Sequence, residues 1–343
     1  MNIKAFLNTL SVRLHTLPIV ILYVTEGCNL RCISCSYRDR LPNELSLDEI
    51  AQHADSLARY GLKTIVYSGG EPLLRRDFPR ICAIFARHAV RQSLLTNGLL
   101  LEKRLNEVAP FLSEIIVSLD GANAETHNSI RGLDSFDQIL KGITSCVNSK
   151  PHPSVAIRTV IQKRNFLQLP AMVELAKSLA VDRISFLAAD VLSDSFGRAS
   201  RGSVMPADEL QLNDSEVIEF RRLIVKMVKD HAADFATNFI STTPDGLFHI
   251  LQYFEALIGK AEFPRNYCNA PMVSAVITSQ GEMLPCYFLP GYGNIRLSTI
   301  PELANSPRAI STREKVKHYT LERCQRCVCT LNMQPLSALL GRL

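Results

Sequence analysis

The chain has 343 residues, of which 47% are hydrophobic and 21% are charged, enough for a large core in one α/β domain with a smaller appended domain. The formal net charge of +5 is small and the basic residues are scattered, so charge does not indicate a nucleic-acid-binding protein. The longest apolar run, Leu17 to Val24, is too short to span a membrane, and the N-terminus lacks a secretory cleavage site. We therefore expect neither membrane contact nor export.

The ten cysteines are unevenly placed and, without an export signal, indicate metal binding in the reducing cytoplasm. Three lie near the N-terminus, five lie near the C-terminus, and Cys82 and Cys146 lie between them. These two fall in apolar helical stretches, where free cysteine is usually a buried hydrophobic residue. We predict that they have no chemical role.

Residues 1–18 are predicted to form a helical extension. At helical spacing, one face of this segment carries apolar side chains, namely Ile3, Phe6, Leu7, Leu10 and Leu14. We favour a helix that packs this face on the protein's own core. The alternative is a helix that rests on a membrane surface or on an apolar partner.

From residue 19 to residue 190, short β-branched segments alternate with amphipathic helical segments, a pattern typical of βα units around a parallel sheet. The clearest helix begins at Ser46, which forms a capping-box sequence with Glu49. The predicted strands are Ile19 to Val24, Thr64 to Tyr67, Gln92 to Leu95, Glu114 to Leu119, Val155 to Ile161 and Arg183 to Leu187. These units predict a partial (β/α)6 TIM-like barrel with its functional residues at the carboxyl ends of the strands.

Cys28, Cys32 and Cys35 follow the first predicted strand with C-x3-C-x2-C spacing. Thiolates are soft ligands that suit iron-sulfur clusters, and a four-iron cluster ordinarily takes four cysteines. Three cysteines would therefore leave one iron without a protein ligand. Such an open metal position is where chemistry can occur.

Other polar or glycine-rich motifs also directly follow predicted strands. They are Ser68 to Pro72, Thr96 to Gly98, Ser118 to Gly121, Asn165, and Ala188 to Asp190. Each motif alone is typical of a structural turn. Because the carboxyl ends of parallel strands meet at one rim, the motifs together predict a pocket there.

Residues 191–261 are predicted to form a connecting loop and helices, and residues 262–343 a second domain. We interpret the polar stretch Ser193 to Ser203 as an ordinary surface loop, with a lid over the barrel mouth as the alternative. The other predicted elements are helices from Asp214 to Asp230, Gly246 to Gly259 and Pro307 to His318, and a β-hairpin made of Met272 to Thr278 and Met283 to Phe288.

Four cysteines of the second domain, Cys268, Cys286, Cys324 and Cys327, supply enough thiolates for another cluster or for a tetrahedral zinc site. Their uneven spacing disfavours a zinc ribbon. Cys329 is left over: it could replace Cys327 as a ligand, donate a hydrogen atom near the substrate, or have no role.

In order and spacing, the segments Cys28 to Cys35, Gly69 to Pro72, Thr96 to Gly98 and Ser118 to Gly121 resemble the motif set of radical S-adenosylmethionine (SAM) enzymes, over residues 19–190. One departure is Ser34, because that family usually has an aromatic residue at this position. Tyr37 is the candidate to pack on the adenine of SAM in place of that aromatic residue. The C-terminal cysteines resemble the Twitch domain, a shortened SPASM auxiliary-cluster domain. Their number favours one auxiliary cluster over the two of a full SPASM domain.

The resemblance implies that the first three cysteines hold a 4Fe-4S cluster whose open iron binds the amino and carboxylate groups of SAM. Reductive cleavage of SAM would give a 5'-deoxyadenosyl radical that abstracts hydrogen from the substrate. The residues implied to contact SAM are Gly69, Gly70, Glu71, Thr96, Asn97, Ser118, Asp120, Arg131, Asn165 and Ala188. For Asp120, His127 and Arg131, a solvated loop salt bridge is an equally good interpretation.

We therefore expect SAM and two 4Fe-4S clusters as cofactors, one catalytic and one auxiliary. The auxiliary cluster favours net oxidation, either dehydrogenation of a small molecule or crosslinking of a peptide. No separate peptide-recognition domain is evident before Ile19, which slightly disfavours a peptide. The expected electron donor is a protein such as flavodoxin or ferredoxin.

Asp190, Arg158 and Tyr287 are the candidates for acid/base or substrate-binding roles, because they fall at strand ends or in the predicted hairpin. The alternative to an enzyme is a non-catalytic iron-sulfur or zinc protein that serves in electron transfer or as a scaffold. That alternative explains the cysteines but not the motifs at the rim.

Overall fold

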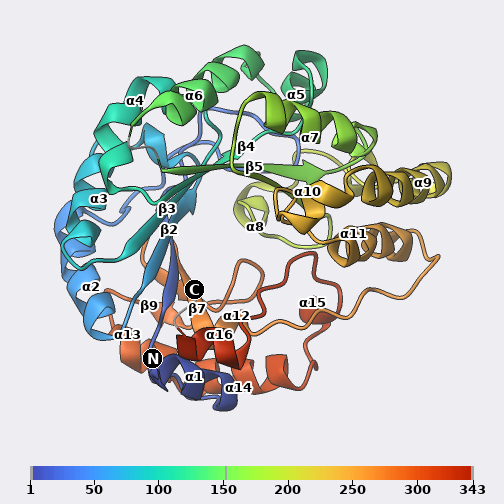
Figure 1. Ribbon diagram of the computed structural model, residues 1–343. Helices are drawn as coiled ribbons and strands as arrows, with labels where there is room; N and C mark the ends of the chain where they lie inside the picture. The colour runs from blue at the N-terminus through green and yellow to red at the C-terminus, as the bar shows by residue number, and fades with distance from the viewer. Residues whose placement is uncertain (1–2, 151–152, 341–343) are drawn as a thin grey trace.

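One curved sheet organises the protein (Figure 1). The computed structural model describes residues 3–150 and 153–340, and within them nine strands pair in the order β6-β5-β4-β3-β2-β1-β7-β8-β9. The first strands are β1 (Ile19–Thr25), β2 (Thr64–Gly69), β3 (Arg91–Thr96), β4 (Glu114–Ser118), β5 (Ser154–Ile161) and β6 (Arg183–Ala188). All neighbours from β6 to β1 are parallel, which confirms the predicted α/β fold with a partial barrel.

Helices cover the outer side of this sheet (Figure 1). In chain order they are α2 (Leu47–Arg59), α3 (Phe78–Ala86), α4 (Leu101–Val108), α5 (Ala124–Arg131), α6 (Phe136–Asn148) and α7 (Leu169–Ser178). The predicted capping box is present at the start of α2, because the Ser46 side chain accepts from the N–H of Glu49 and the Glu49 carboxylate accepts from the N–H of Ser46. Cys82 in α3 and Cys146 in α6 are fully buried, as predicted.

Side chains alternate between the two faces of each strand. In β5, Val155 and Ile157 are fully buried, whereas Ser154 and Arg158 on the opposite face are half-buried. We call the face of the sheet that points away from α2, α3, α4, α6 and α7 the inner face. The rim motifs follow the carboxyl ends of the strands that form it.

The C-terminal region continues the same sheet. β7 (Ser274–Ile277) pairs in parallel with β1, and Val276 lies opposite Ile21. β8 (Glu282–Leu284) and β9 (Gly293–Asn294) then add in antiparallel fashion. The predicted hairpin is confirmed as β7 and β8, although its first strand is shorter because Ala270–Val273 form α12. The barrel and the auxiliary-cysteine region therefore share one hydrogen-bonded sheet.

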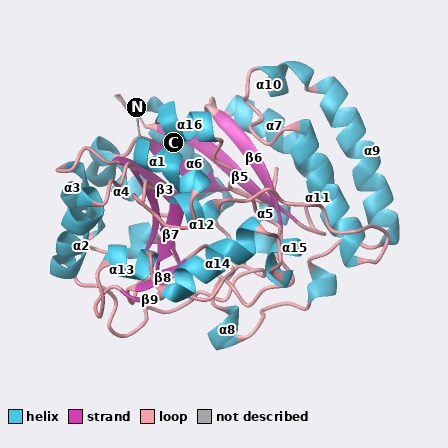
Figure 2. Ribbon diagram, turned by 90° about the horizontal axis from the view of Figure 1, so that it is seen from below, coloured by secondary structure: helices cyan, strands magenta, loops and turns pink. Residues whose placement is uncertain are grey.

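The remaining helices lie beyond β6 and around the C-terminal strands. They are α1 (Ile3–Leu10), α8 (Arg198–Arg201), α9 (Asp214–Asp230), α10 (Ala232–Ala236), α11 (Pro244–Leu257), α13 (Ile300–Ala304), α14 (Pro307–Lys317), α15 (Glu322–Gln325) and α16 (Pro335–Leu340). Short 3-10 helices cover Pro72–Leu74, Ala109–Phe111, Phe166–Gln168 and Ala207–Glu209. Figure 2 shows α9 and α11 side by side at one end of the molecule. Among the described residues, no helix combines the length and apolarity that membrane crossing requires.

Helix α1 forms where predicted but packs through a different face. Its buried residues are Ala5 and Asn8, and the Asn8 side-chain amide donates to the carbonyls of Thr16 (2.7 Å) and Met272 (3.0 Å). The exposed members of the predicted apolar face are Ile3 (59%), Leu7 (38%) and Leu10 (57%). The prediction that this face packs on the core is therefore wrong, because a small residue and a hydrogen-bonding residue dock the helix instead.

An ion pair joins α2 to the C-terminal region. Arg296 Nε and Nη2 lie 2.5 and 3.1 Å from the two carboxylate oxygens of Glu49. Hydrogen bonds from Arg296, which outweigh partial burial, lower the pKa of Glu49 from 4.5 to about 2. Because the pKa is lower in the folded state, the pair stabilises the protein above the unfolded pKa, and this stabilisation is lost as the pH falls toward the folded pKa.

We expect Arg296→Ala to lower the free energy of unfolding by about 0.5–1 kcal/mol near neutral pH, the usual range for a partly exposed pair. The loss should shrink as the pH falls toward about 3. Urea denaturation at both pH values measures it, with exposed Arg308→Ala as the matched control. An equal loss at both pH values would show that the pair is not the cause.

Candidate active site and metal centres

The three N-terminal cysteines lie on a loop that leaves the carboxyl end of β1. Backbone hydrogen bonds hold this loop against the last turn of α5: the Arg31 N–H donates to the Arg131 carbonyl and the Ile33 N–H to the Ile130 carbonyl, each at 3.0 Å. Cys32 is buried, and the other two cysteines are half-buried. The loop is therefore positioned by the barrel rather than by its own contacts alone.

Each of these thiols touches a polar group from another part of the rim. The contacts are Asn97 Nδ2 to Cys28 Sγ (3.9 Å), Arg131 Nη1 to Cys32 Sγ (3.7 Å) and Cys35 Sγ to the Phe196 carbonyl (3.7 Å). Burial raises the pKa of Cys28, and raises that of Cys35 to about 12. Because a metal ligand must be a thiolate, metal binding has to displace the protons of Cys28 and Cys35 against this shift.

The glycine pair after β2 packs directly on the cysteine loop. The Gly70 N–H donates to the Thr25 carbonyl and the Glu71 N–H to the Gly27 carbonyl, both at 2.8 Å. Gly69 has a φ of 111°, a conformation that side chains other than glycine rarely adopt. We predict that this turn contacts the amino group of SAM. Because these two N–H groups are already bonded, the carbonyl oxygens of the turn are the groups that can accept from that amino group.

The Glu71 side chain connects two turns of the rim through hydrogen bonds. It is fully buried and accepts hydrogen bonds from the N–H groups of Leu73 (2.9 Å) and Asn97 (2.7 Å) and from Thr96 Oγ1 (2.8 Å). Burial raises its pKa to about 7 against the pull of these donors. Glu71 and Thr96 therefore join the turns after β2 and β3, and Asn97 Nδ2 extends this network to Asn29 at 2.8 Å.

Asp120 and Arg131 form a buried ion pair beside the cysteine loop. Arg131 Nη2 lies 2.7 Å from Asp120 Oδ2, and the other carboxylate oxygen accepts from the Val160 N–H at 2.8 Å. The Asp120 N–H donates to His127 Nδ1 at 3.3 Å. Burial lowers the pKa of His127 to about 3, so its imidazole is neutral. The salt-bridge interpretation is thus present in the structure, and contact with SAM stays a prediction.

Asn165 organises the end of β5. Its side-chain nitrogen donates to the carbonyls of Asp120 and Val160, both at 2.9 Å, and its side-chain oxygen accepts from the Gln162 N–H at 2.8 Å. Sequence reasoning missed Gln162, whose only signal is its position directly after a strand. Gln162 is fully buried, and both polar atoms of its side chain have no partner in the described part of the chain.

Two further polar atoms of the rim have no hydrogen bond. Within residues 3–150 and 153–340, these are His127 Nε2 and Arg131 Nε. Both atoms are covered by protein, so they are not what the rim presents to a ligand. The fit to a four-iron cluster with SAM rests instead on the donor set: three thiols, two of them half-buried, on a loop that is hydrogen-bonded to the glycine turn.

Residues 190–203, which we call the strap, begin at the end of β6. The Asp190 carboxylate forms an ion pair with Arg198 and accepts from the N–H groups of Leu192 and Ser193, each at 3.3 Å. Arg198 Nη1 also donates to the Asp190 carbonyl at 2.8 Å. Asp190 is thus engaged within the strap, and an acid/base role for it stays a prediction.

The strap connects the cysteine loop to the C-terminal region. The Ser36 N–H donates to the Phe196 carbonyl at 2.9 Å, and Ser195 Oγ donates to the Tyr287 carbonyl at 2.7 Å. The Phe196 ring packs against the rings of Tyr287 and Phe288, with centroids 6.2 and 6.0 Å away. The interpretation of this segment as an ordinary surface loop is therefore wrong, because it braces both cysteine regions.

We expect Phe196→Ala to loosen the strap, since the ring anchors it to the C-terminal region. Amide exchange of residues 190–203 and of Ser36 should become about tenfold faster, as expected when local opening costs less. Hydrogen exchange with mass spectrometry measures this, and Val204→Ala, at a 44% exposed position beside the strap, is the control. Unchanged exchange in the strap would contradict the bracing role.

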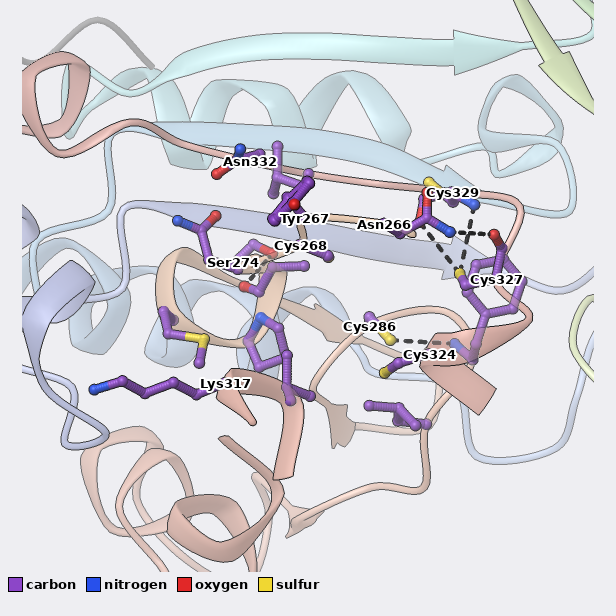
Figure 3. Close-up of a pocket in the computed structure, with 18 of the residues that line it drawn as sticks. Asn266, Tyr267, Cys268, Ser274, Cys286, Lys317, Cys324, Cys327, Cys329 and Asn332 are labelled. Carbon is purple, nitrogen blue, oxygen red and sulfur yellow. Dashed lines mark hydrogen bonds between the residues drawn. The ribbon is translucent and has the colours of Figure 1, made fainter. Parts of the chain in front are cut away.

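The five C-terminal cysteines surround one cavity of about 400 Å³ (Figure 3). Cys268 precedes α12, Cys286 follows β8, Cys324 lies in α15, and Cys327 and Cys329 follow that helix. Figure 3 shows the last four toward one end of the cavity, with Lys317, Ser274 and Asn332 toward the other. Residues far apart in the sequence thus form one sulfur-lined site.

Backbone N–H groups point at two of these sulfurs. The Phe288 N–H donates to Cys286 Sγ at 3.5 Å, and the Cys329 N–H donates to Cys327 Sγ at 3.4 Å. Burial raises the pKa of Cys286 to about 12 and that of Cys324 and Cys329 to about 11. Donors of this kind support thiolate ligands once a metal displaces the protons. Cys329 lines the same cavity as the four predicted ligands.

The five thiols line the cavity without converging on one point. Among the described residues, no group of three or more His, Cys, Asp or Glu side chains comes close enough together to hold one metal ion. A four-iron cluster at this site, rather than zinc, stays a prediction.

The other two candidate substrate-facing residues are Arg158 and Tyr287. Arg158 lies on β5, and Tyr287 follows β8, where burial raises its pKa. Ser118 on β4 lies beside Arg158 in the sheet register, and Ala188 is buried at the end of β6. Tyr37 also packs near this place, in edge contact with Tyr23 at 6.1 Å between ring centroids.

Known protein families match both regions of the chain. The family model described as the radical SAM superfamily matches residues 22–176. The SPASM model, described as an iron-sulfur cluster-binding domain, matches residues 268–328. The first match covers the cysteine loop and the rim motifs up to Asn165, whereas Ala188 to Asp190 lie beyond it. The second match begins at Cys268 and ends just after Cys327.

The sequence is also similar to curated proteins. It is 34% identical over 206 residues to an Fe-coproporphyrin III synthase of Methanosarcina barkeri, which covers 58% of this chain and 49% of that protein. It is 29% identical over 280 residues to the mycofactocin maturase MftC of Mycobacterium tuberculosis, which covers 77% of this chain and 63% of the relative. The chain thus spans about half to two thirds of the length of these relatives.

Solved structures share the fold. SuiB of Streptococcus suis bound to S-adenosylmethionine aligns with a TM-score of 0.64 at 16% identity, over 98% of this chain and 76% of SuiB. The structure described as native anSMEcpe with bound AdoMet and Cp18Cys peptide aligns with a TM-score of 0.62 at 18% identity, over 90% and 88% of the two chains. The solved structures show the fold, and the family matches show that the chain carries a radical SAM domain over residues 22–176 and a SPASM iron-sulfur cluster-binding domain over residues 268–328.

Proposed function

We propose that this protein is an enzyme that cleaves SAM reductively and abstracts a hydrogen atom from its substrate. When bound, a 4Fe-4S cluster with SAM supplies the 5'-deoxyadenosyl radical. The observation that carries the proposal is the joining of the cysteine loop to the glycine turn by the Gly70 and Glu71 N–H groups. This contact supports a common rim for the implied open iron and the implied SAM site.

The chain's own residues hold that rim in place before any ligand arrives. Glu71 joins two turns, and the Asp120–Arg131 pair fixes α5 beside the cysteine loop. The strap contacts Cys35 and Ser36 from the other side. Because the rim is already ordered, it gives up less conformational entropy when it binds and orients a ligand.

We further propose net oxidation of the substrate with a second 4Fe-4S cluster, held by Cys268, Cys286, Cys324 and Cys327. Such a cluster supplies an electron acceptor near the substrate. Aromatic packing between the two centres supports this: Tyr23 packs near Cys28 and Cys35, and Tyr287, the neighbour of Cys286, stacks on Tyr23 with ring centroids 6.3 Å apart.

For the substrate, we propose a peptide, with a small molecule as the second candidate. The support is that the maturase covers more of this chain than the synthase does, and that solved structures of similar fold are described with a precursor peptide or a Cp18Cys peptide. We also propose an acidic one-electron donor such as flavodoxin or ferredoxin. The proposed location is the cytoplasm.

The direct test is formation of 5'-deoxyadenosine from SAM by the anaerobically reconstituted protein after reduction with dithionite. We expect turnover in the wild type and in Cys82→Ala, since Cys82 is a buried core residue of α3, which covers the outer side of the sheet. We expect none in Cys32→Ala. Equal formation in Cys32→Ala, or none in a fully iron-loaded wild type, would favour the electron-transfer or scaffold alternative.

A further inference from the structure

Arg158 occupies a central place on the inner face of the sheet. In the strand register it lies between Ser118 of β4 and Ser185 of β6. Its neighbours on the outer face of β5, including Ile157, are fully buried, so the Arg158 side chain extends inward. The half-buried guanidinium is thus held at the level where the rim begins.

Arg158 makes one hydrogen bond within residues 3–150 and 153–340. Its Nε donates to Ser185 Oγ at 3.2 Å, and no carboxylate in these residues lies within ion-pair distance of it. By contrast, Arg131 and Arg198 each pair with an aspartate. A partly buried arginine without a partner is costly. Its two terminal nitrogens are therefore left to bind something else.

The C-terminal region adjoins the same inner face of the sheet. Tyr287 and Cys329 line the sulfur-lined cavity together with Ile21 and Val276 of the inner face. Tyr287 also stacks on Tyr23 of β1, with ring centroids 6.3 Å apart. Because the sheet curves around its inner face, the Arg158 side chain extends toward the side on which this cavity lies.

We propose that Arg158 binds a carboxylate of the substrate, which places the substrate between the two cysteine sites. This rests on the proposed function, because it assigns a substrate to that active site. A planar guanidinium binds a carboxylate through two parallel hydrogen bonds and so fixes orientation as well as position. The other source of a carboxylate at the rim is SAM itself, so the test must separate the two.

Phenylacetate is a suitable probe, since it joins a carboxylate to an aromatic body, and phenylacetamide is its neutral counterpart. Calorimetry on the anaerobic holoenzyme with SAM bound should show at least about tenfold tighter binding of the acid than of the amide, as expected for charged hydrogen bonds. Arg158→Ala should abolish this preference, and Arg158→Lys should retain only part of it, because lysine lacks the fork. Arg59→Ala, at an exposed site on α2, should bind like the wild type.

SAM affinity forms the second arm. It should stay within about threefold of the wild type in Arg158→Met, which keeps the bulk of the side chain if Arg158→Ala folds poorly. A tenfold loss of SAM affinity would assign the carboxylate to SAM and overturn the proposal. Equal binding of acid and amide by the wild type would also overturn it. Loss of SAM cleavage in the wild type with the acid preference intact would contradict only the proposed function.

Discussion

We expect Gly70→Ala to abolish SAM cleavage. A Cβ atom at this position would lie 2.2 Å from the Gly27 carbonyl oxygen and 2.6 Å from that of Glu26, far inside the contact distance of non-bonded atoms. Both obstacles are backbone atoms of the loop that carries the first three cysteines. The turn and the loop must therefore separate, which breaks the hydrogen bond between Glu71 and Gly27.

Iron content after anaerobic reconstitution and the rate of 5'-deoxyadenosine formation measure the effect. Gly70→Ala should lose about half of its iron, that of the N-terminal site, because the C-terminal cysteines are untouched. Gly259→Ala is the control: its φ of 74° makes it strained as well, but its added Cβ would meet nothing within 4 Å. A rate within about threefold of the wild type in Gly70→Ala would contradict the close approach.

Asp120→Ala should lower the free energy of unfolding by about 3–5 kcal/mol, the usual cost of leaving one partner of a buried ion pair. Arg131 would then be a buried charge facing only the thiol of Cys32, and the Val160 N–H would lose its acceptor. Urea denaturation of the metal-free protein measures this without interference from the clusters.

Two further variants separate charge from packing. Asp120→Asn retains an acceptor for the Val160 N–H but removes the charge, so we expect an intermediate loss. In Asp120→Ala/Arg131→Met both charges are gone, and the double variant should recover much of the stability, since apolar replacement of a buried pair is often nearly neutral. A loss below about 1 kcal/mol in Asp120→Ala, or strict additivity in the double variant, would contradict a coupled pair.

Local sequence patterns predicted most of the barrel. The β-branched runs matched all six parallel strands, and the Ser46 and Glu49 pair marked the start of α2, because periodicity and capping depend on residues close in the chain. The topology of a parallel sheet then brought the rim motifs together. The cysteine spacings likewise indicated two groups, and the family matches cover both.

Long-range pairing and side-chain direction were not predictable in this way. Nothing near β7 in the sequence indicates that four residues, starting at Ser274, add to β1. The strap looked like a polar loop, since its anchors, such as Tyr287, are about 90 residues away in the chain. Similarly, sequence position alone does not show that the side chains of Glu71 and Asn165 turn into the protein to brace the rim.

The structure gives the two cysteine groups a common setting. They follow strands of one continuous sheet, and they are bridged by the strap. This arrangement accounts for features that a single metal site leaves unexplained, including the aromatic contact between Tyr23 and Tyr287. The central claim is therefore that two separate clusters act on one substrate space.

Iron and sulfide analysis with Mössbauer spectroscopy of the reconstituted protein tests this claim most directly. The account predicts about eight irons per chain, falling to about four when Cys28, Cys32 and Cys35 are replaced by alanine, and to about four when Cys268, Cys286, Cys324 and Cys327 are replaced. Only the second variant should retain formation of 5'-deoxyadenosine. About four irons in the wild type, unchanged by replacement of the first three cysteines, would contradict it.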